Sequence, residues 1–299
     1  MYRMLVIVVL LATRAAVAQP AGLFPAYLIQ LPRSVTTVLV AETDTSILHR
    51  YENGENGIVF HDSGYMSIGQ NGVGKRQAWD RRTPLGIYFV NERLDTSGLH
   101  EKYGPMAFPL DYPNVWDRIK KRAGDGIWIH GVAANSERRP PLDTDGCIAV
   151  PNEALMILEG ALRPMITPVI ITRDVNWVSA DEISAIRKEL KITLDAWARS
   201  FRSGDLYGYL SLYAEDFEFR GMDRSEWTAY RVQAIAATPI RGFSIDDLLL
   251  LGDPEEEGFY LSRFRQTIID EANTVVTIKR LYWRRSTDGE LRIVAEDNG

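Results

Sequence analysis

The sequence predicts a mostly β domain followed by a smaller α+β domain, and three observations support this division. From Thr36 to Arg173 the apolar residues occur in short β-branched and aromatic runs separated by Gly, Pro, Asn and Asp. From Ser179 onward they recur at helical spacing, and strand-like runs return only later in the chain. The charge divides at the same place, because residues 181–299 hold 16 basic and 22 acidic side chains whereas residues 1–180 hold 18 of each.

The first 18 residues have the features of a secretory signal peptide. Arg3 supplies a positive charge, Met4–Ala12 form an apolar run, and Ala16-Val17-Ala18 is a small-residue cleavage pattern. The apolar run is shorter than the roughly 20 residues that a transmembrane helix needs. We therefore expect export with cleavage after Ala18, and an uncleaved anchor is the alternative.

Residues 19–35 are expected to form a linker, and residues 36–175 are expected to form the β-rich domain. Five segments of this domain have the composition of strands. They are TTVLVAE from Thr36, GIVFHDSGYMSIG from Gly57, LGIYFVNE from Leu85, GIWIHGVA from Gly126 and TPVIITRD from Thr167. Helical periodicity is sparse here, and the best candidates for helices are residues 114–122 and 152–162.

Residues 180–299 are expected to form the second domain. Ser179 and Glu182 make a capping box, in which each side chain bonds to the backbone amide of the other residue at the start of a helix. Apolar residues then recur every three or four positions, at Ile183, Ile186, Leu190, Leu194 and Trp197. A second helix is expected at residues 206–213, followed by strands, and the turn at residues 286–289 is typical of a hairpin.

Cys147 is the only cysteine of the chain. In an oxidising compartment structural cysteines usually occur in pairs, so a single thiol is either buried and inert or reactive. A histidine close by could accept its proton. Of the four histidines, His130 is the best placed, because it ends a strand-like run directly before Gly131. The 16 residues between His130 and Cys147 are mostly polar and predict a surface loop that returns the chain beside the same strand.

Other roles for these two residues stay open on the sequence pattern alone. A lone cysteine is often buried and inert, and a histidine at a strand end is more often packed or solvated than catalytic. A zinc site is disfavoured, because one cysteine and four scattered histidines show no ligand spacing, and we expect neither a metal nor another cofactor. Gly146 favours catalysis, since it removes side-chain bulk where a substrate carbonyl would approach backbone N–H groups.

The pattern from His130 to Cys147 resembles the signature of the L,D-transpeptidases of the YkuD family, which reads His-Gly, a loop, and then [Ser/Thr]-x-Gly-Cys. The chain reads TDGC at residues 144–147, and TPLGIY at residues 83–88 resembles the family's T-P-x-G-x-[YF] motif. The resemblance covers roughly residues 36–173. Two departures, Asp145 in place of His and Ala149 in place of Arg or Asn, fit better with the exported Gram-negative members.

The resemblance implies a β-sandwich-like catalytic domain that acts on peptidoglycan in the periplasm of a Gram-negative-type envelope. Cys147 would attack the carbonyl between meso-diaminopimelate and the terminal D-alanine of a tetrapeptide stem, and His130 would accept the thiol proton. An amine would then take the acyl group from the thioester, giving a 3-3 crosslink or an attached wall protein. If water took it instead, the enzyme would be an L,D-carboxypeptidase or an amidase.

Residues beside the pair are expected to support it. The backbone amides of Gly146 and Cys147 would stabilise the oxyanion, and Gly131 belongs to the same supporting set. Thr144 either positions the loop through its hydroxyl or is a simple turn residue. Asp145 could orient the imidazole, although a Thr-Asp-Gly stretch favours a turn former.

Residues that bind the substrate are harder to predict. Arg138 and Arg139 could bind a carboxylate of the stem peptide, because guanidinium groups hold carboxylates through two hydrogen bonds. Solvated loop charges are the alternative for both. Tyr112, Trp116 and Trp128 could line a groove or belong to the core.

The segment from Ser179 to Gly299 resembles an NTF2-like or SnoaL-like domain, particularly the copies that follow YkuD domains in exported bacterial proteins. Five aromatic residues could line a ligand cavity or fill a core, namely Trp197, Tyr209, Tyr213, Phe217 and Trp227. The expected role is a module that binds a wall component or a wall-associated partner protein. The acidic charge argues against nucleic acid as a partner.

A non-catalytic wall-binding protein is the alternative of a different class. The catalytic hypothesis predicts a Cys147 thiol with a lowered pKa and fast labelling near neutral pH. A binding protein predicts a thiol that reacts no faster than a free cysteine.

Overall fold

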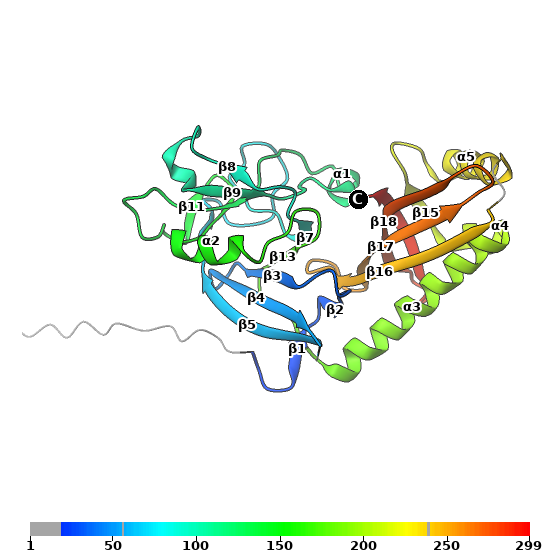
Figure 1. Ribbon diagram of the computed structural model, residues 1–299, viewed down its shortest axis with the longest axis horizontal. Helices are drawn as coiled ribbons and strands as arrows, with labels where there is room; N and C mark the ends of the chain where they lie inside the picture. The colour runs from blue at the N-terminus through cyan, green and yellow to red at the C-terminus, as the bar shows by residue number, and fades with distance from the viewer. Residues whose placement is uncertain (1–18, 56, 238–239) are drawn as a thin grey trace, which may run out of the picture.

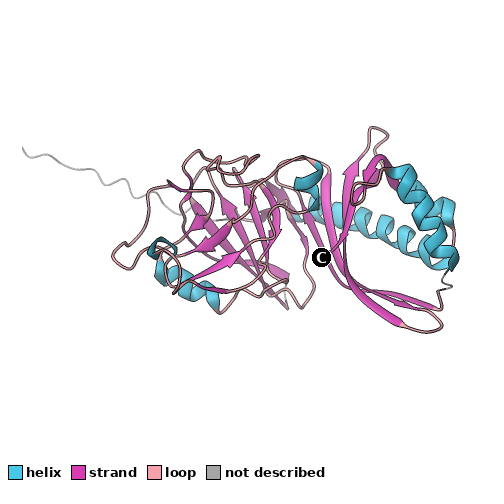
Figure 2. Ribbon diagram, turned by 90° about the horizontal axis from the view of Figure 1, so that it is seen from above, coloured by secondary structure: helices cyan, strands magenta, loops and turns pink. Residues whose placement is uncertain are grey.

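The computed structural model describes residues 19–55, 57–237 and 240–299, and the expected signal peptide at residues 1–18 lies outside this part of the chain. Two lobes are visible (Figure 1, Figure 2). The regular structure of the first lobe (residues 36–175) is mostly strand, and the second lobe (residues 180–299) has a long helix lying across a twisted sheet. The expected fold class, a mostly β domain followed by a smaller α+β domain, is confirmed.

Eleven strands are present in the described residues of the first lobe. They are β3 (Thr37–Glu42), β4 (Ile47–Gly54), β5 (Gly57–Tyr65), β6 (Ile68–Gly69), β7 (Gly86–Phe89), β8 (Leu94–Asp95), β9 (Met106–Pro109), β10 (Trp128–His130), β11 (Leu142–Thr144), β12 (Ile148–Ala149) and β13 (Pro168–Thr172). One sheet has the order β5-β4-β3-β13-β7, a second has the order β12-β10-β9-β8, and β11 pairs with β6.

The middle of the larger sheet is buried on both faces. Strands β3 and β13 run parallel with Val40 opposite Ile170, and every residue of both strands is buried. Continuous apolar runs of this kind are typical of strands that are covered on both sides. On one face Leu39 and Ile171 share a core with Phe108 of the smaller sheet, and the other face meets the second lobe.

Short helices connect these strands: the 3-10 helix η1 (Glu101–Tyr103), α1 (Val115–Ile119) and α2 (Asn152–Glu159). Helix α1 begins with a capping box between Asn114 and Asp117. It is shorter than the predicted span of residues 114–122, because Lys121 has a φ of 56°, a left-handed conformation that an α-helix cannot continue. After α1 the chain reaches β10 through residues 121–127, which contain no helix or strand.

A long helix, α3 (Ala180–Ser203), opens the second lobe. The predicted capping box is present, with the Glu182 amide donating to Ser179 Oγ at 3.2 Å and the Ser179 amide donating to Glu182 Oε2 at 2.9 Å. The helix ends at Gly204, which has the left-handed conformation that glycine adopts at little cost. Leu190 and Leu194 lie on its buried face, and Figure 1 shows the helix lying across the sheet.

In the described part of the chain, the rest of the second lobe supplies five strands of a six-stranded sheet. Its elements are α4 (Leu206–Ser211), β15 (Tyr213–Glu218), α5 (Arg224–Ala237), β16 (Gly242–Gly252), β17 (Phe259–Ile269), β18 (Thr274–Arg285) and β19 (Leu291–Asn298). Strands β18 and β19 are antiparallel and are joined by the predicted turn, where the Gly289 amide donates to the Ser286 carbonyl at 2.9 Å.

The aromatic residues expected either to line a cavity or to fill a core in this lobe are all fully buried. They belong to one cluster: Trp197, Tyr209, Tyr213, Phe217 and Trp227. Trp197 Nε1 donates to Tyr213 Oη at 3.0 Å and Tyr213 Oη donates to Glu296 at 2.9 Å, whereas the buried Trp227 Nε1 has no hydrogen-bond partner among the described residues. They fill the core between the helices and the sheet.

The linker expected at residues 19–35 is instead partly folded. Strand β1 (Leu23–Pro25) pairs with β14 (Trp177–Ser179), and β2 (Leu28–Gln30) extends the second-lobe sheet beside β16. Tyr27 between them is buried and donates its hydroxyl to the Asp174 carbonyl at 3.0 Å. The sequence did not reveal these strands, because each one pairs with a segment far along the chain and is only three residues long.

The two lobes share a buried apolar layer. Val40, Ile87 and Ile170 of the first lobe pack in one cluster with Leu251 and Phe259 of the second lobe. Burial of apolar surface is the main favourable term in folding, so the lobes stabilise each other. No helix in the described part of the chain is both long enough and apolar enough to span a bilayer.

Replacing Phe259 by alanine is expected to lower the free energy of unfolding by about 3–5 kcal/mol. The ring is 2% exposed and packs on Trp116 of the first lobe with centroids 4.5 Å apart. Urea denaturation followed by circular dichroism would measure the loss. Val276→Ala on the same sheet is the control, because that side chain is more than half exposed. An unchanged midpoint for Phe259→Ala would contradict the shared core.

Candidate active site

Strands β10 and β12 bring Cys147 and His130 into one pocket. The two strands pair in parallel, with Ile129 opposite Ile148 and His130 opposite Ala149, so the histidine ends one strand and the cysteine directly precedes the other. Both side chains line a pocket of about 380 Å³. The other residues of its wall are Lys75, Ala78, Trp79, Lys102, Tyr103, Gly124, Asp125, Gly126, Trp128, Arg139, Thr144 and Asp145.

The Cys147 thiol is largely enclosed. It is 8% exposed, and its S–H donates to the Gly126 carbonyl at 3.2 Å. Burial raises its pKa to about 11, against smaller opposing effects of the Trp128 backbone and the Lys102 charge. The thiol is therefore protonated at neutral pH in the resting protein, which contradicts the lowered pKa expected from the catalytic hypothesis.

His130 is held as a neutral base. Its ring is 2% exposed, and Nδ1 lies 2.6 Å from the Gly131 carbonyl. A carbonyl oxygen can only accept, so Nδ1 carries the hydrogen and Nε2 is the acceptor of the neutral ring. Burial, together with the charges of Arg139 and Lys102, lowers the His130 pKa to about 4. The imidazole is consequently able to take a proton at neutral pH.

The loop before the thiol is fixed by Thr144. The Thr144 hydroxyl donates to the Cys147 carbonyl at 2.7 Å and accepts from the Gly146 amide at 3.1 Å. Gly146 has a φ of 127°, and a Cβ there would lie 2.7 Å from the Arg82 carbonyl oxygen, so only glycine fits. Because its amide is already bonded to Thr144, Gly146 does not offer the free N–H expected for the oxyanion.

Gly131 is required by the packing of α2. A Cβ on this residue would lie 2.1 Å from Asn152 Oδ1. Asn152 bonds to Val132 in both directions, accepting from its amide and donating to its carbonyl, each at 2.9 Å. The contact between Asn152 and Val132 fixes the backbone directly after His130. It thereby fixes the Gly131 carbonyl, which orients the imidazole.

The charged residues expected near the site divide into two groups. Asp145 lies at the pocket but pairs with Lys102 at 3.0 Å rather than with the imidazole. Arg139 also lines the pocket. Arg138 does not: its guanidinium lies over the Tyr65 ring, 4.9 Å from the centroid, outside the pocket wall.

The aromatic residues expected to form a groove are also divided. Trp128 lies in the pocket wall, whereas Tyr112 is buried in the core and Trp116 packs against the second lobe. The Trp79 side chain, which is 92% exposed, lines the pocket and was not predicted.

Lys102 and Tyr103 were also missed. Tyr103 packs edge-on against the His130 ring with centroids 5.1 Å apart, and Lys102 lies over the Tyr103 ring. An adjacent lysine and tyrosine are too common in sequences to indicate a site. Among the described residues, no group of three or more His, Cys, Asp or Glu side chains is arranged to hold a metal ion.

The fold and the pocket together define the class of protein, a two-domain chain whose β-rich domain carries a thiol and an imidazole in one pocket. Residues 36–171 match the L,D-transpeptidase catalytic domain family YkuD. Residues 189–297 match the Cds6 C-terminal NTF2-like domain. The chain thus joins a YkuD catalytic domain to an NTF2-like domain, and both resemblances found in the sequence are confirmed.

Two solved structures share the whole two-domain fold. Bd1075 from Bdellovibrio bacteriovorus superposes with a TM-score of 0.76 at 24% identity, covering 93% of this chain and 98% of that one. The helical cell shape determining protein Pgp2 from Campylobacter jejuni gives a TM-score of 0.75 at 24% identity, covering 91% and 95%. At this identity the likeness establishes the fold. No protein of curated function matches the chain.

Proposed function

We propose that this chain is an exported cysteine L,D-transpeptidase that acts on the tetrapeptide stems of peptidoglycan. The observation that carries the proposal is the shared pocket, where the Cys147 thiol lies with a neutral His130 whose Nδ1 is tied to the Gly131 carbonyl. A substrate bound in this pocket would therefore contact both a nucleophile, Cys147, and a proton acceptor, His130. The family match of residues 36–171 supports the choice of substrate class.

The reaction proceeds in two acyl transfers. His130 Nε2 takes the thiol proton while Cys147 Sγ bonds to the carbonyl carbon between meso-diaminopimelate and D-alanine. The C–N bond then breaks, and the imidazolium returns the proton to the leaving amine of D-alanine, which leaves a thioester. An amine of a second stem, deprotonated by His130, attacks the thioester, forms an amide and restores the thiol.

The oxyanion of each step is assigned to the backbone amide of Cys147. The Gly146 amide is already donated to Thr144, so it is not the donor. The positive charge of Lys102 at the pocket also favours developing negative charge. The thiol and the imidazole are both neutral in the resting protein. The proton therefore moves only as the sulfur forms its bond to the carbonyl carbon of a bound substrate.

Export and the role of the second lobe complete the proposal. The envelope form of the protein would begin at Gln19 in the periplasm, which intact-mass measurement on the cell fraction would test. The second lobe would bind a wall component or a wall-associated partner protein. Pgp2 is described as a helical cell shape determining protein. We extend a role in cell shape to this chain, and loss of the gene should then change cell shape.

Incubation with purified sacculi or a disaccharide-tetrapeptide tests the reaction, with products read by mass spectrometry. Loss of D-alanine together with a 3-3 dimer supports the transpeptidase. Release of D-alanine without crosslinks would make the protein an L,D-carboxypeptidase that uses water at the same site, and cleavage of a diaminopimelate-linked protein would make it an amidase. If no product forms with any acceptor, the alternative of a non-catalytic wall-binding protein would be favoured.

Replacing Trp79 by alanine is expected to raise the KM for a soluble disaccharide-tetrapeptide by roughly 2- to 10-fold, with kcat little changed. The exposed indole lines the pocket and takes no part in the proposed bond-forming or proton-transfer steps, so it is expected to contribute binding only. Steady-state kinetics would separate the two constants. Ile192→Ala, at an exposed position on α3, is the matched control. An unchanged KM would remove Trp79 from the binding surface.

A further inference from the structure

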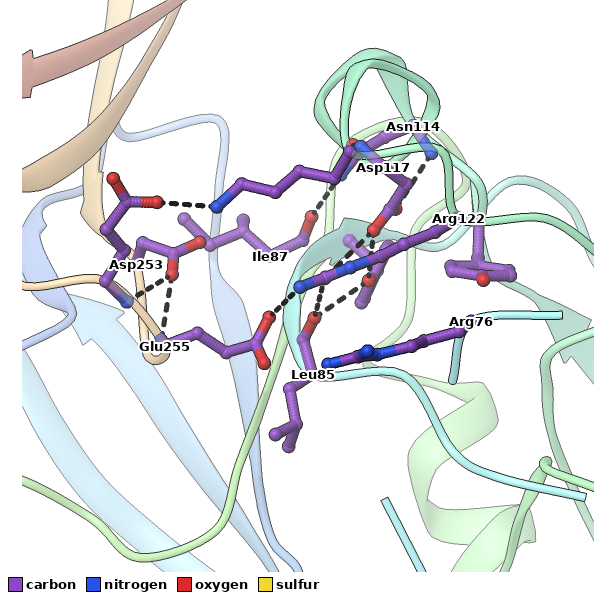
Figure 3. Close-up of polar contacts among 12 residues, drawn as sticks. Arg76, Leu85, Ile87, Asn114, Asp117, Arg122, Asp253 and Glu255 are labelled. Atoms are coloured by element: carbon purple, nitrogen blue, oxygen red, sulfur yellow. Dashed lines mark hydrogen bonds and ion pairs between the residues drawn. The ribbon is translucent and has the colours of Figure 1, made fainter. Parts of the chain in front are cut away.

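A polar contact joins the two lobes close to the active-site pocket. The turn between β16 and β17 places Glu255 and Glu256 against the segment that follows α1 (Figure 3). Glu255 pairs with Arg122 at 2.7 Å, and Glu256 pairs with Lys120 at 2.9 Å. The turn itself is preorganised, because Asp253 Oδ1 accepts from the amides of Glu255 and Glu256 at 2.8 and 3.0 Å.

Arg122 is held from both lobes. Its guanidinium reaches Asp117 Oδ1 at 3.3 Å and the Leu85 carbonyl at 3.4 Å while it also contacts Glu255. Its backbone amide donates to the Asp117 carbonyl at 2.8 Å. Figure 3 shows the side chain extended between Asp117 on the first lobe and Glu255 on the second. The position of Arg122 is therefore set partly by a residue of the second lobe.

The chain from Arg122 leads directly into the pocket wall. Ala123 donates its amide to the Arg76 carbonyl at 2.9 Å, and residues 124–126 line the pocket. Gly126 ends this segment and accepts the Cys147 S–H through its carbonyl. Gly124 and Gly126 have φ values of 104° and 69° and carry no side chains that could anchor the segment. At one end the wall is held by Arg122 and by the backbone of Ala123, whose carbonyl also accepts from the Tyr112 hydroxyl at 3.1 Å. At the other end it is held by the buried Ile127.

We propose that Glu255 and Arg122 are positioning residues, through which the second lobe holds the wall that carries the hydrogen-bond acceptor of the Cys147 thiol. A partner or wall component that moved the β16–β17 turn would then change the surroundings of the thiol without entering the pocket. The effect on turnover rests on the proposed function, whereas the effect on the thiol does not.

The first test measures alkylation of Cys147 in the full-length protein by iodoacetamide, which requires no substrate. Glu255→Gln removes the charge of an exposed turn residue and is expected to speed labelling by roughly 2- to 30-fold, with an unchanged melting temperature. Glu271→Gln is the matched control, because that carboxylate pairs with Arg241 on the exposed far end of the same sheet. On a disaccharide-tetrapeptide, kcat should fall in Glu255→Gln while KM stays near the wild-type value.

A double-mutant cycle tests whether the two residues act together. Arg122→Gln should also speed labelling, and Glu255→Gln added to it should have little further effect, because the second change removes a partner that is already lost. The proposal would be overturned if the double variant were labelled at a rate that equals the product of the two single effects. It would also be overturned if Glu255→Gln were labelled no faster than the Glu271→Gln control. Faster labelling in a protein that releases no D-alanine would refute the proposed function and uphold the positioning role.

Discussion

Replacing Cys147 by alanine is expected to reduce D-alanine release by at least ~10⁴-fold, because no other group in the pocket can form the thioester. The described wall contains no serine and no second thiol, and its one threonine hydroxyl, on Thr144, is committed to two hydrogen bonds in the loop. Product analysis by mass spectrometry would measure the loss. An acid-quenched acyl-enzyme should be found on the wild-type protein and be absent from the variant.

The control must separate lost chemistry from lost folding. Ser67→Ala is suitable, since the Ser67 hydroxyl is buried in the same lobe and has no hydrogen-bond partner among the described residues. It removes a single buried polar atom, as Cys147→Ala does, and should leave both activity and stability near wild type. D-alanine release that persists in a folded Cys147→Ala protein would exclude the thioester mechanism.

The catalytic pair could be predicted from sequence because its signals are local. His130 ends an apolar run before a glycine, and Gly146 precedes the only cysteine. Both glycines are needed for steric reasons, since a Cβ at Gly131 would strike Asn152 and one at Gly146 would strike the Arg82 carbonyl. The β-branched and aromatic runs and the capping box at Ser179 are also local patterns. Most of the strands and the long helix could therefore be predicted from the sequence in the same way.

What the sequence did not reveal depends on distant contacts. Lys102 reaches the pocket from the three-residue helix η1 and Trp79 from a turn, and neither belongs to a recognisable motif. Strand β2 joins a sheet whose other strands come from the far end of the chain. The Cys147 pKa was predicted in the wrong direction for the same reason. A neighbouring histidine lowers a thiol pKa only when it is charged, and burial keeps His130 neutral while it raises the Cys147 pKa directly.

Replacing His130 by glutamine is expected to lower kcat/KM by about 10²- to 10⁴-fold, because the pocket loses its proton acceptor. In the wild-type protein kcat/KM should fall as the pH drops toward about 4, where the imidazole becomes protonated. It should stay level through neutral pH, since the thiol pKa is about 11. A midpoint near 6.5, the ordinary histidine value, would mean that the working imidazole is solvated rather than buried as described.

The same substitution also has an effect that needs no substrate. The His130 pKa is lowered from 6.5 to about 4 in the folded protein, so below pH 6.5 the unfolded chain binds a proton that the native state refuses. Stability should fall as the pH drops from 6.5 to 4, by about 3 kcal/mol from this group. His130→Gln should remove that part of the pH dependence in urea titrations. If the variant lost activity but kept the full wild-type pH dependence, the buried neutral imidazole would be the wrong description of the site.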